Sequence, residues 1–77
     1  VHGGEKSYTR YLFMSGQDKI LKKVGEEAAE TIIASKNNNG KEVLYEMSDL
    51  WYHCLVLLSF HGVVPNELLQ ELKKRRK

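Results

Sequence analysis

The segment that decides the fold is EMSDLWYHCLVLL, residues 46–58. It contains no proline or glycine, and nearly every position after Asp49 is apolar or aromatic. A helix that is apolar almost all round has to be buried on several sides. Three other short helices could hardly cover it, so we predict a bundle completed by a second copy of the chain. Cover by a segment preceding residue 1 is the alternative.

Outside this segment, the sequence predicts three further helices and no strand. The breaks between helices are Gly16, the stretch NNNG at residues 37–40, and Gly62. The expected helices are Ser7 to about Ser15, Gln17 or Asp18 to Lys36, about Lys41 to His61, and a fourth that begins near Pro65. The predicted fold is therefore an all-α, four-helix bundle in a single domain, residues 1–77.

Composition excludes several classes of protein. The single cysteine, Cys54, cannot form an intrachain disulfide, and it is most simply a core residue. The apolar run is too short to span a bilayer, so we expect no membrane partner and a cytoplasmic location. The net charge is +2, and the basic residues 73–77 suit a helix C-terminus better than a nucleic-acid contact.

Two acidic clusters lie at helical spacing. The first is EEAAE, residues 26–30, and the second is EMSD, residues 46–49. Residues three or four apart share one face of a helix, so the carboxylates of each cluster repel one another unless a cation lies among them. A site built from oxygen ligands suits hard divalent cations, above all Mg²⁺ where the substrate carries phosphates.

The two clusters are expected to face each other across consecutive antiparallel helices. On the second helix, Glu27 lies nearest the apolar edge, nearly in line with Ile20, and should point partly inward. On the third helix, His53 shares a side with the acidic pair Glu46 and Asp49. His53 could orient a carboxylate or contact substrate, but a satisfied, partly buried histidine is an equal alternative. The alternative for both clusters is an ordinary solvated helix face with ion pairs such as Lys23–Glu27.

Three stretches carry a resemblance to a known family. They are Ser7-Tyr8-Thr9, DKILKKVGEE at residues 18–27, and DLWYH at residues 49–53 followed by LVLL at residues 55–58. On these residues the chain resembles the phosphoribosyl-ATP pyrophosphatase family of histidine biosynthesis. More broadly, the EExxE and ExxD clusters resemble the all-α, MazG-like nucleoside triphosphate pyrophosphatase superfamily, which includes the dimeric dUTPases.

The resemblance implies a hydrolase that cleaves the α–β phosphoanhydride bond of phosphoribosyl-ATP, giving phosphoribosyl-AMP and pyrophosphate. It also implies Mg²⁺ as cofactor, while a homodimer is expected from the apolar helix described above. Carried over residue by residue, the Mg²⁺ ligands are Glu27, Glu30, Glu46 and Asp49. The catalytic residues are Glu26 and Glu27, and the triphosphate meets Lys23 and Lys19. His53 is placed beside the metal ligands, and not among them, from its position on the helix alone.

The chain departs from the family at its start. Family members usually carry another helix before the Ser-Tyr-Thr motif, and only six residues precede it here. We therefore expect the domain to lack an N-terminal helix. In many bacteria this domain follows a phosphoribosyl-AMP cyclohydrolase domain in one polypeptide, so such a fusion partner is expected.

Two other functions stay open from sequence. A housecleaning nucleoside triphosphate pyrophosphatase would use the same metal machinery with a different base and ribose pocket. A non-catalytic helical dimerisation module, or a small nucleic-acid binder, would not need the carboxylates. A binder should spread basic residues along one face, and here they are confined to the tail and a lysine stripe beside the carboxylates. We expect no nucleic-acid partner.

Overall fold

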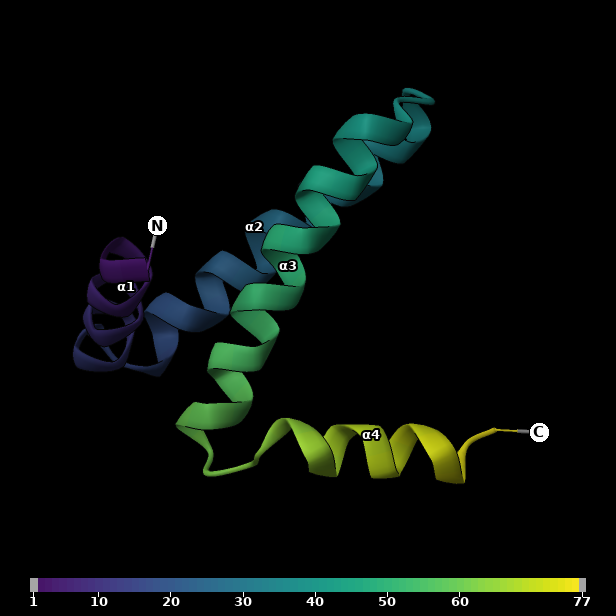
Figure 1. Cartoon of the computed structure of the whole chain (residues 1–77). Helices are drawn as coiled ribbons and strands as arrows, with labels where there is room; N and C mark the ends of the chain where they lie inside the picture. Colours follow the sequence, from purple (N-terminus) through teal and green to yellow (C-terminus); the bar gives the residue numbers. More distant parts are fainter. Residues whose placement is uncertain (1, 77) are drawn as a thin grey trace.

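A computed structural model describes residues 2–76 of the chain, and the side chains of residues 7–76. It contains four helices, which are α1 (His2–Ser15), α2 (Gln17–Lys36), α3 (Gly40–Phe60) and α4 (Pro65–Lys74) (Figure 1). None of the described residues lies in a strand. The predicted all-α fold with four helices is confirmed, while the two end residues of the predicted domain, Val1 and Lys77, lie outside the described part.

The ends of α2, α3 and α4 follow the predicted breaks. The side chain of Asn39 caps α3 by accepting a hydrogen bond from the backbone nitrogen of Glu42 at 3.1 Å. Gly16, between α1 and α2, has a φ of 96°, a conformation that glycine adopts without strain. Gly62 has a φ of 74° just beyond the end of α3. Local chemistry at three short breaks therefore sets these boundaries.

The predicted start of the first helix was wrong. We expected the helix to begin at Ser7, with this serine as its N-cap, but α1 begins at His2 and passes through Ser7 without interruption. A serine is a good cap, but it is also tolerated inside a helix, where only a few tenths of a kcal/mol separate it from better helix formers. The N-terminal residues therefore extend α1 by more than a turn.

Most of the tertiary packing is between α2 and α3, which form an antiparallel hairpin closed by the turn at residues 37–39. In Figure 1, α1 lies across the open end of this hairpin and α4 extends away from it. The core sits where α1, α2 and α3 meet, around the buried side chains of Leu12, Ile20 and Val56. No residue of α4 is buried.

The outer face of α3 is apolar and open. Leu44 is 71% exposed and Trp51 is 55% exposed, and Met47 and Leu55 line the same shallow pocket. The polar side of α3 instead faces α2, which reverses the usual arrangement of an amphipathic helix. The prediction was that a second copy would cover this helix, and it did not single out one face. None of the described helices combines the length and the apolarity that crossing a bilayer requires.

Candidate metal and phosphate site

The seam between α2 and α3 carries carboxylates where helix pairs usually bury apolar side chains. The buried residues of α2 recur every seven positions, at Ile20, Glu27 and Ala34. Glu27 is 4% exposed, so its predicted inward orientation is confirmed. Burying a carboxylate is costly unless it is paired with a charge or a metal. The helical pattern thus forces an acidic group into the interior of the hairpin.

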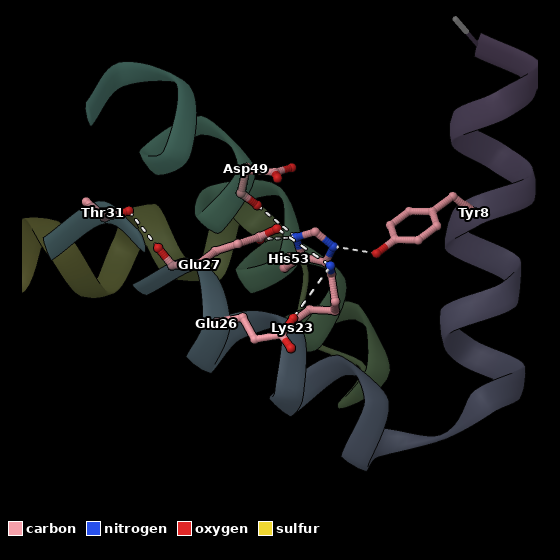
Figure 2. Close-up of polar contacts among 7 residues, drawn as sticks. All are labelled: Tyr8, Lys23, Glu26, Glu27, Thr31, Asp49 and His53. Carbon is pink, nitrogen blue, oxygen red and sulfur yellow. Dashed lines mark hydrogen bonds and ion pairs between the residues drawn. The ribbon is translucent and has the colours of Figure 1, made fainter. Parts of the chain in front are cut away.

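On α3, Asp49 and His53 lie opposite Glu27 (Figure 2). The three residues offer ligand atoms that all lie within 4.8 Å of one another, an arrangement that could hold a metal ion. We call Glu27 and Asp49 the inner carboxylate pair. The sequence predicted that these two residues would converge, and the structure brings them together with His53.

The ring of His53 is fixed on both nitrogens. Its Nδ1 lies 2.9 Å from the backbone carbonyl oxygen of Asp49 and 2.5 Å from Oε1 of Glu27. Its Nε2 lies 2.8 Å from the hydroxyl of Tyr8, on α1 (Figure 2). The ring is 2% exposed, so no bulk water competes for these contacts. His53 therefore has a single orientation beside the inner carboxylate pair.

Glu27 has one carboxylate oxygen without a hydrogen-bond donor. Oε1 is buried and accepts no hydrogen bond, although Nδ1 of His53 is close to it, because that N–H is directed at the carbonyl of Asp49. Burial raises the pKa of Glu27, and so does its proximity to Asp49, while His53 and Lys23 act in the opposite direction. A cation bound at this carboxylate would supply the missing partner.

A second group of carboxylates lies one turn nearer to the loop. We call Glu30, Glu42 and Glu46 the outer carboxylate group. They line a pocket of about 190 Å³ that also includes Asn37 and Asn39. Desolvation raises the pKa of Glu46 to about 7, helped by its hydrogen bond to Glu30 and by the charges of Glu30 and Glu42. The predicted ligands Glu27, Glu30, Glu46 and Asp49 thus occupy two successive levels of one seam.

The two lysines predicted to meet phosphate lie in different places. Nζ of Lys23 is 3.7 Å from Glu26 and 4.0 Å from Glu27, at the edge of the inner carboxylate pair. Glu26 itself is exposed. Lys19 instead lies over the ring of Tyr11, 5.7 Å from its centroid. Lys23 is therefore the cation that accompanies the carboxylates, while Lys19 contacts α1.

No role at this site was predicted for Tyr8. It contacts His53 from a position 45 residues away in the chain, and no periodicity links the two. The signal that could have identified Tyr8 was the Ser7-Tyr8-Thr9 motif, because Thr9 also bonds α3 through the hydroxyl of Tyr52 at 2.5 Å. Both residues that follow Ser7 therefore attach α1 to α3.

Comparisons with known proteins agree on one family. The sequence pattern described as phosphoribosyl-ATP pyrophosphohydrolase matches residues 2–76. The chain is 60% identical over 70 residues to a phosphoribosyl-ATP pyrophosphatase of Pelotomaculum thermopropionicum. This alignment covers 91% of the chain and 71% of that protein. It is 54% identical to the phosphoribosyl-ATP pyrophosphatase of Bacillus mycoides, covering 91% of the chain and 65% of the relative. A histidine biosynthesis bifunctional protein of Caldanaerobacter subterraneus is 56% identical, covering 95% of the chain and 36% of that protein.

Proposed function

The chain belongs to the phosphoribosyl-ATP pyrophosphohydrolase family, and from this premise we propose that it hydrolyses the α–β phosphoanhydride bond of phosphoribosyl-ATP, giving phosphoribosyl-AMP and pyrophosphate. This would be the second step of histidine biosynthesis, carried out in the cytoplasm. The chain spans 71% and 65% of the length of two of the enzymes it matches, so the full activity of those relatives is part of the proposal.

Magnesium is the proposed cofactor. The buried, unpaired oxygen of Glu27 is the observation that carries this proposal, because a cation is the partner that it lacks. The proposed ligands are Glu27, Glu30, Glu46 and Asp49, and oxygen ligands of this kind suit Mg²⁺. When bound, Mg²⁺ neutralises charge on the triphosphate and polarises its phosphoryl oxygens.

Binding of the phosphates, activation of water and orientation of the reacting groups are proposed for different residues of the site. Lys23, beside the inner carboxylate pair, is proposed to bind a substrate phosphate as a point charge. Glu26 is exposed next to Lys23, so its carboxylate can reach a water molecule and accept a proton as general base. Glu27 is proposed to orient the reacting groups from inside the seam. Lys19 could reach the far end of the triphosphate only by leaving the ring of Tyr11.

The first experiment is a pyrophosphate-release assay with Mg²⁺, comparing phosphoribosyl-ATP with a panel of ordinary nucleoside triphosphates. We expect turnover of phosphoribosyl-ATP alone, lost on adding a chelator. Turnover of the panel instead would support a housecleaning pyrophosphatase. A folded protein that is silent on every substrate, and that Mg²⁺ does not stabilise, would favour a non-catalytic helical module.

We further propose that a second copy covers the outer face of α3. That face exposes Leu44 and Trp51, which makes it a large apolar surface for so small a chain. Trp51→Ala is expected to weaken the dimer and to cost about 3–5 kcal/mol, because the partner would bury the indole. Sedimentation over a range of concentrations measures this, and a chain that stays monomeric throughout would contradict it.

A functional link to a cyclohydrolase is also proposed. The relative from Caldanaerobacter subterraneus is named as bifunctional, and the part that resembles this chain is 36% of its length. A phosphoribosyl-AMP cyclohydrolase, fused or separate, would consume the proposed product. Coupled assays with that enzyme would show whether phosphoribosyl-AMP is passed on.

A further inference from the structure

We propose that Tyr8 is a positioning residue of this site, because its hydroxyl holds the ring of His53 in the orientation that leaves Oε1 of Glu27 free for a divalent cation. The inference rests on the proposed metal-dependent function. It assigns a role in cation binding to α1, although α1 contributes none of the proposed ligands.

The direction of each hydrogen bond follows from its acceptors. The backbone carbonyl of Asp49 can only accept, so Nδ1 of His53 carries the proton in the contact at 2.9 Å. In the neutral ring, Nε2 is then an acceptor, and the hydroxyl of Tyr8 donates to it at 2.8 Å. The two bonds together select one tautomer and one ring orientation.

This orientation determines what Glu27 receives. The N–H of His53 is directed at Asp49, so Oε1 of Glu27 has no hydrogen-bond donor despite lying 2.5 Å from Nδ1. Without the hydroxyl of Tyr8, the bond to the carbonyl of Asp49 would be the one hydrogen bond left to orient the ring nitrogens. The ring could then turn its donor onto Oε1, where it would compete with a cation for the same lone pairs.

The surroundings of Tyr8 allow the hydroxyl to be tested alone. Its ring makes an edge contact with His53 at a centroid separation of 5.6 Å and stacks near Tyr52 at 6.1 Å. Tyr8→Phe keeps these contacts and removes only the hydrogen bond. A matched control exists in Tyr52→Phe, which removes the hydroxyl that bonds Thr9 across the same α1–α3 contact without reaching Glu27.

The experiment is a Mg²⁺ titration of the unsubstituted chain, Tyr8→Phe and Tyr52→Phe, followed by calorimetry and by thermal unfolding without substrate. Loss of a hydrogen-bond partner that orients a metal ligand typically lowers metal affinity by about 10–100-fold. We expect a loss near the lower end of this range for Tyr8→Phe, because Tyr8 acts on Glu27 through His53. Tyr52→Phe should bind Mg²⁺ like the unsubstituted chain. Equal losses in the two variants would overturn the proposal, because the hydroxyl of Tyr8 would then only hold α1 in place.

A double-mutant cycle tests whether Tyr8 acts through His53. His53→Asn keeps an N–H donor near the position of Nδ1 and removes the acceptor that Tyr8 uses. We expect His53→Asn to retain part of the Mg²⁺ affinity, and adding Tyr8→Phe in that background to lower it no further. Losses that simply add in the double variant would overturn the proposed route.

The assays separate this inference from the proposed function. Mg²⁺ binding that depends on Tyr8, without release of pyrophosphate, would support the positioning role and remove the proposed reaction. Pyrophosphate release with equal Mg²⁺ affinity in both tyrosine variants would do the reverse. Failure of the unsubstituted chain to bind Mg²⁺ would overturn both.

Discussion

The inner carboxylate pair and the outer carboxylate group have the same chemistry but relieve their repulsion differently. The inner pair is buried beside Lys23 and His53. Burial and the neighbouring Asp49 raise the pKa of Glu27, and the charge of Lys23 offsets only part of this rise. The outer group lies nearer to solvent, and among the residues whose side chains are described, no lysine or arginine forms an ion pair with it. A proton shared within this group relieves the repulsion instead, since the pKa of Glu46 is about 7.

This difference indicates which level of the seam would bind the proposed cation more strongly. At the outer level a proton can replace a cation near neutral pH, because the carboxylates are accessible to water. At the inner level the burial of Glu27 and the fixed ring of His53 leave one oxygen unpaired. Burial and fixed neighbours, more than the number of carboxylates, therefore make the inner pair the stronger candidate.

The largest effect should come from removing one charge at each level. Glu27→Gln or Asp49→Asn should abolish turnover, a loss of at least about 100-fold, with the helical fold retained or stabilised as repulsion is relieved. Glu46→Gln should lose less turnover, because the outer carboxylate group already carries a proton part of the time near neutral pH. Steady-state kinetics and circular dichroism of the three variants measure this. Normal activity in Glu27→Gln would remove the proposed site, and equal losses would make both levels one site.

The next effect is stabilisation by Mg²⁺. A cation bound at 100 times its Kd should raise the free energy of unfolding by about 2.7 kcal/mol. In a domain of this size each kcal/mol raises Tm by about 4–8 °C. Thermal unfolding with Mg²⁺ and with a chelator should show this rise in the unsubstituted chain and in Glu46→Gln, reduced in the latter. A full rise in Glu27→Gln would place the cation outside the inner pair.

A smaller effect is expected from pH in metal-free buffer. The folded-state pKa of Glu46 is about 7 against an ordinary value of 4.5, so the folded state holds this proton more tightly than the unfolded state. Its stabilising contribution is therefore complete below the ordinary value and is lost as the pH rises through about 7.

Glu46→Gln cannot titrate, so its Tm should increasingly exceed that of the unsubstituted chain across this pH window. Thermal unfolding of both proteins at closely spaced pH values measures the difference. A difference that stays constant with pH would show that the outer group does not share protons in this way.

The smallest effect on stability should come from Lys23→Gln. Its ion pair with Glu26 is exposed, and such pairs contribute about 0–1 kcal/mol, while the buried carboxylate of Glu27 is 4.0 Å away. The KM for substrate should rise instead, because a phosphate contact is lost. Lys19→Gln, on the ring of Tyr11, is the matched control and should change KM less. Equal effects on KM would place both lysines at the substrate.

The parts of the fold that follow from local chemistry could be predicted. Gly16, Asn39, Gly62 and Pro65 mark helix ends because each has a backbone preference or a capping side chain that acts within a few residues. The inward position of Glu27 followed from its periodicity with Ile20. The start of α1 was missed because Ser7 suits both a cap and a helix interior.

The contacts that complete the site could not be read from spacing. Periodicity placed His53 on the same face as Asp49, and it left open whether the ring would meet a carboxylate, a substrate or only the core. That outcome depends on Tyr8, which reaches the ring through the packing of α1 on α3. Whether the two acidic clusters form one level or two likewise depends on the axial register of α2 against α3, which the spacing within each helix does not specify.

The turn between α2 and α3 sets this register. In an antiparallel hairpin, a step towards the turn on α2 is matched by a step towards the turn on α3, which is why Glu27 meets Asp49 and Glu30 meets Glu46. The turn uses Asn38 at a φ of 55° and the cap of Asn39, and it holds no proposed ligand. One residue inserted after it, at the start of α3, would rotate the proposed ligands Glu46 and Asp49 by about 100° and move them away from α2. The number of residues between the turn and Glu46 therefore determines whether the carboxylates of α3 face those of α2.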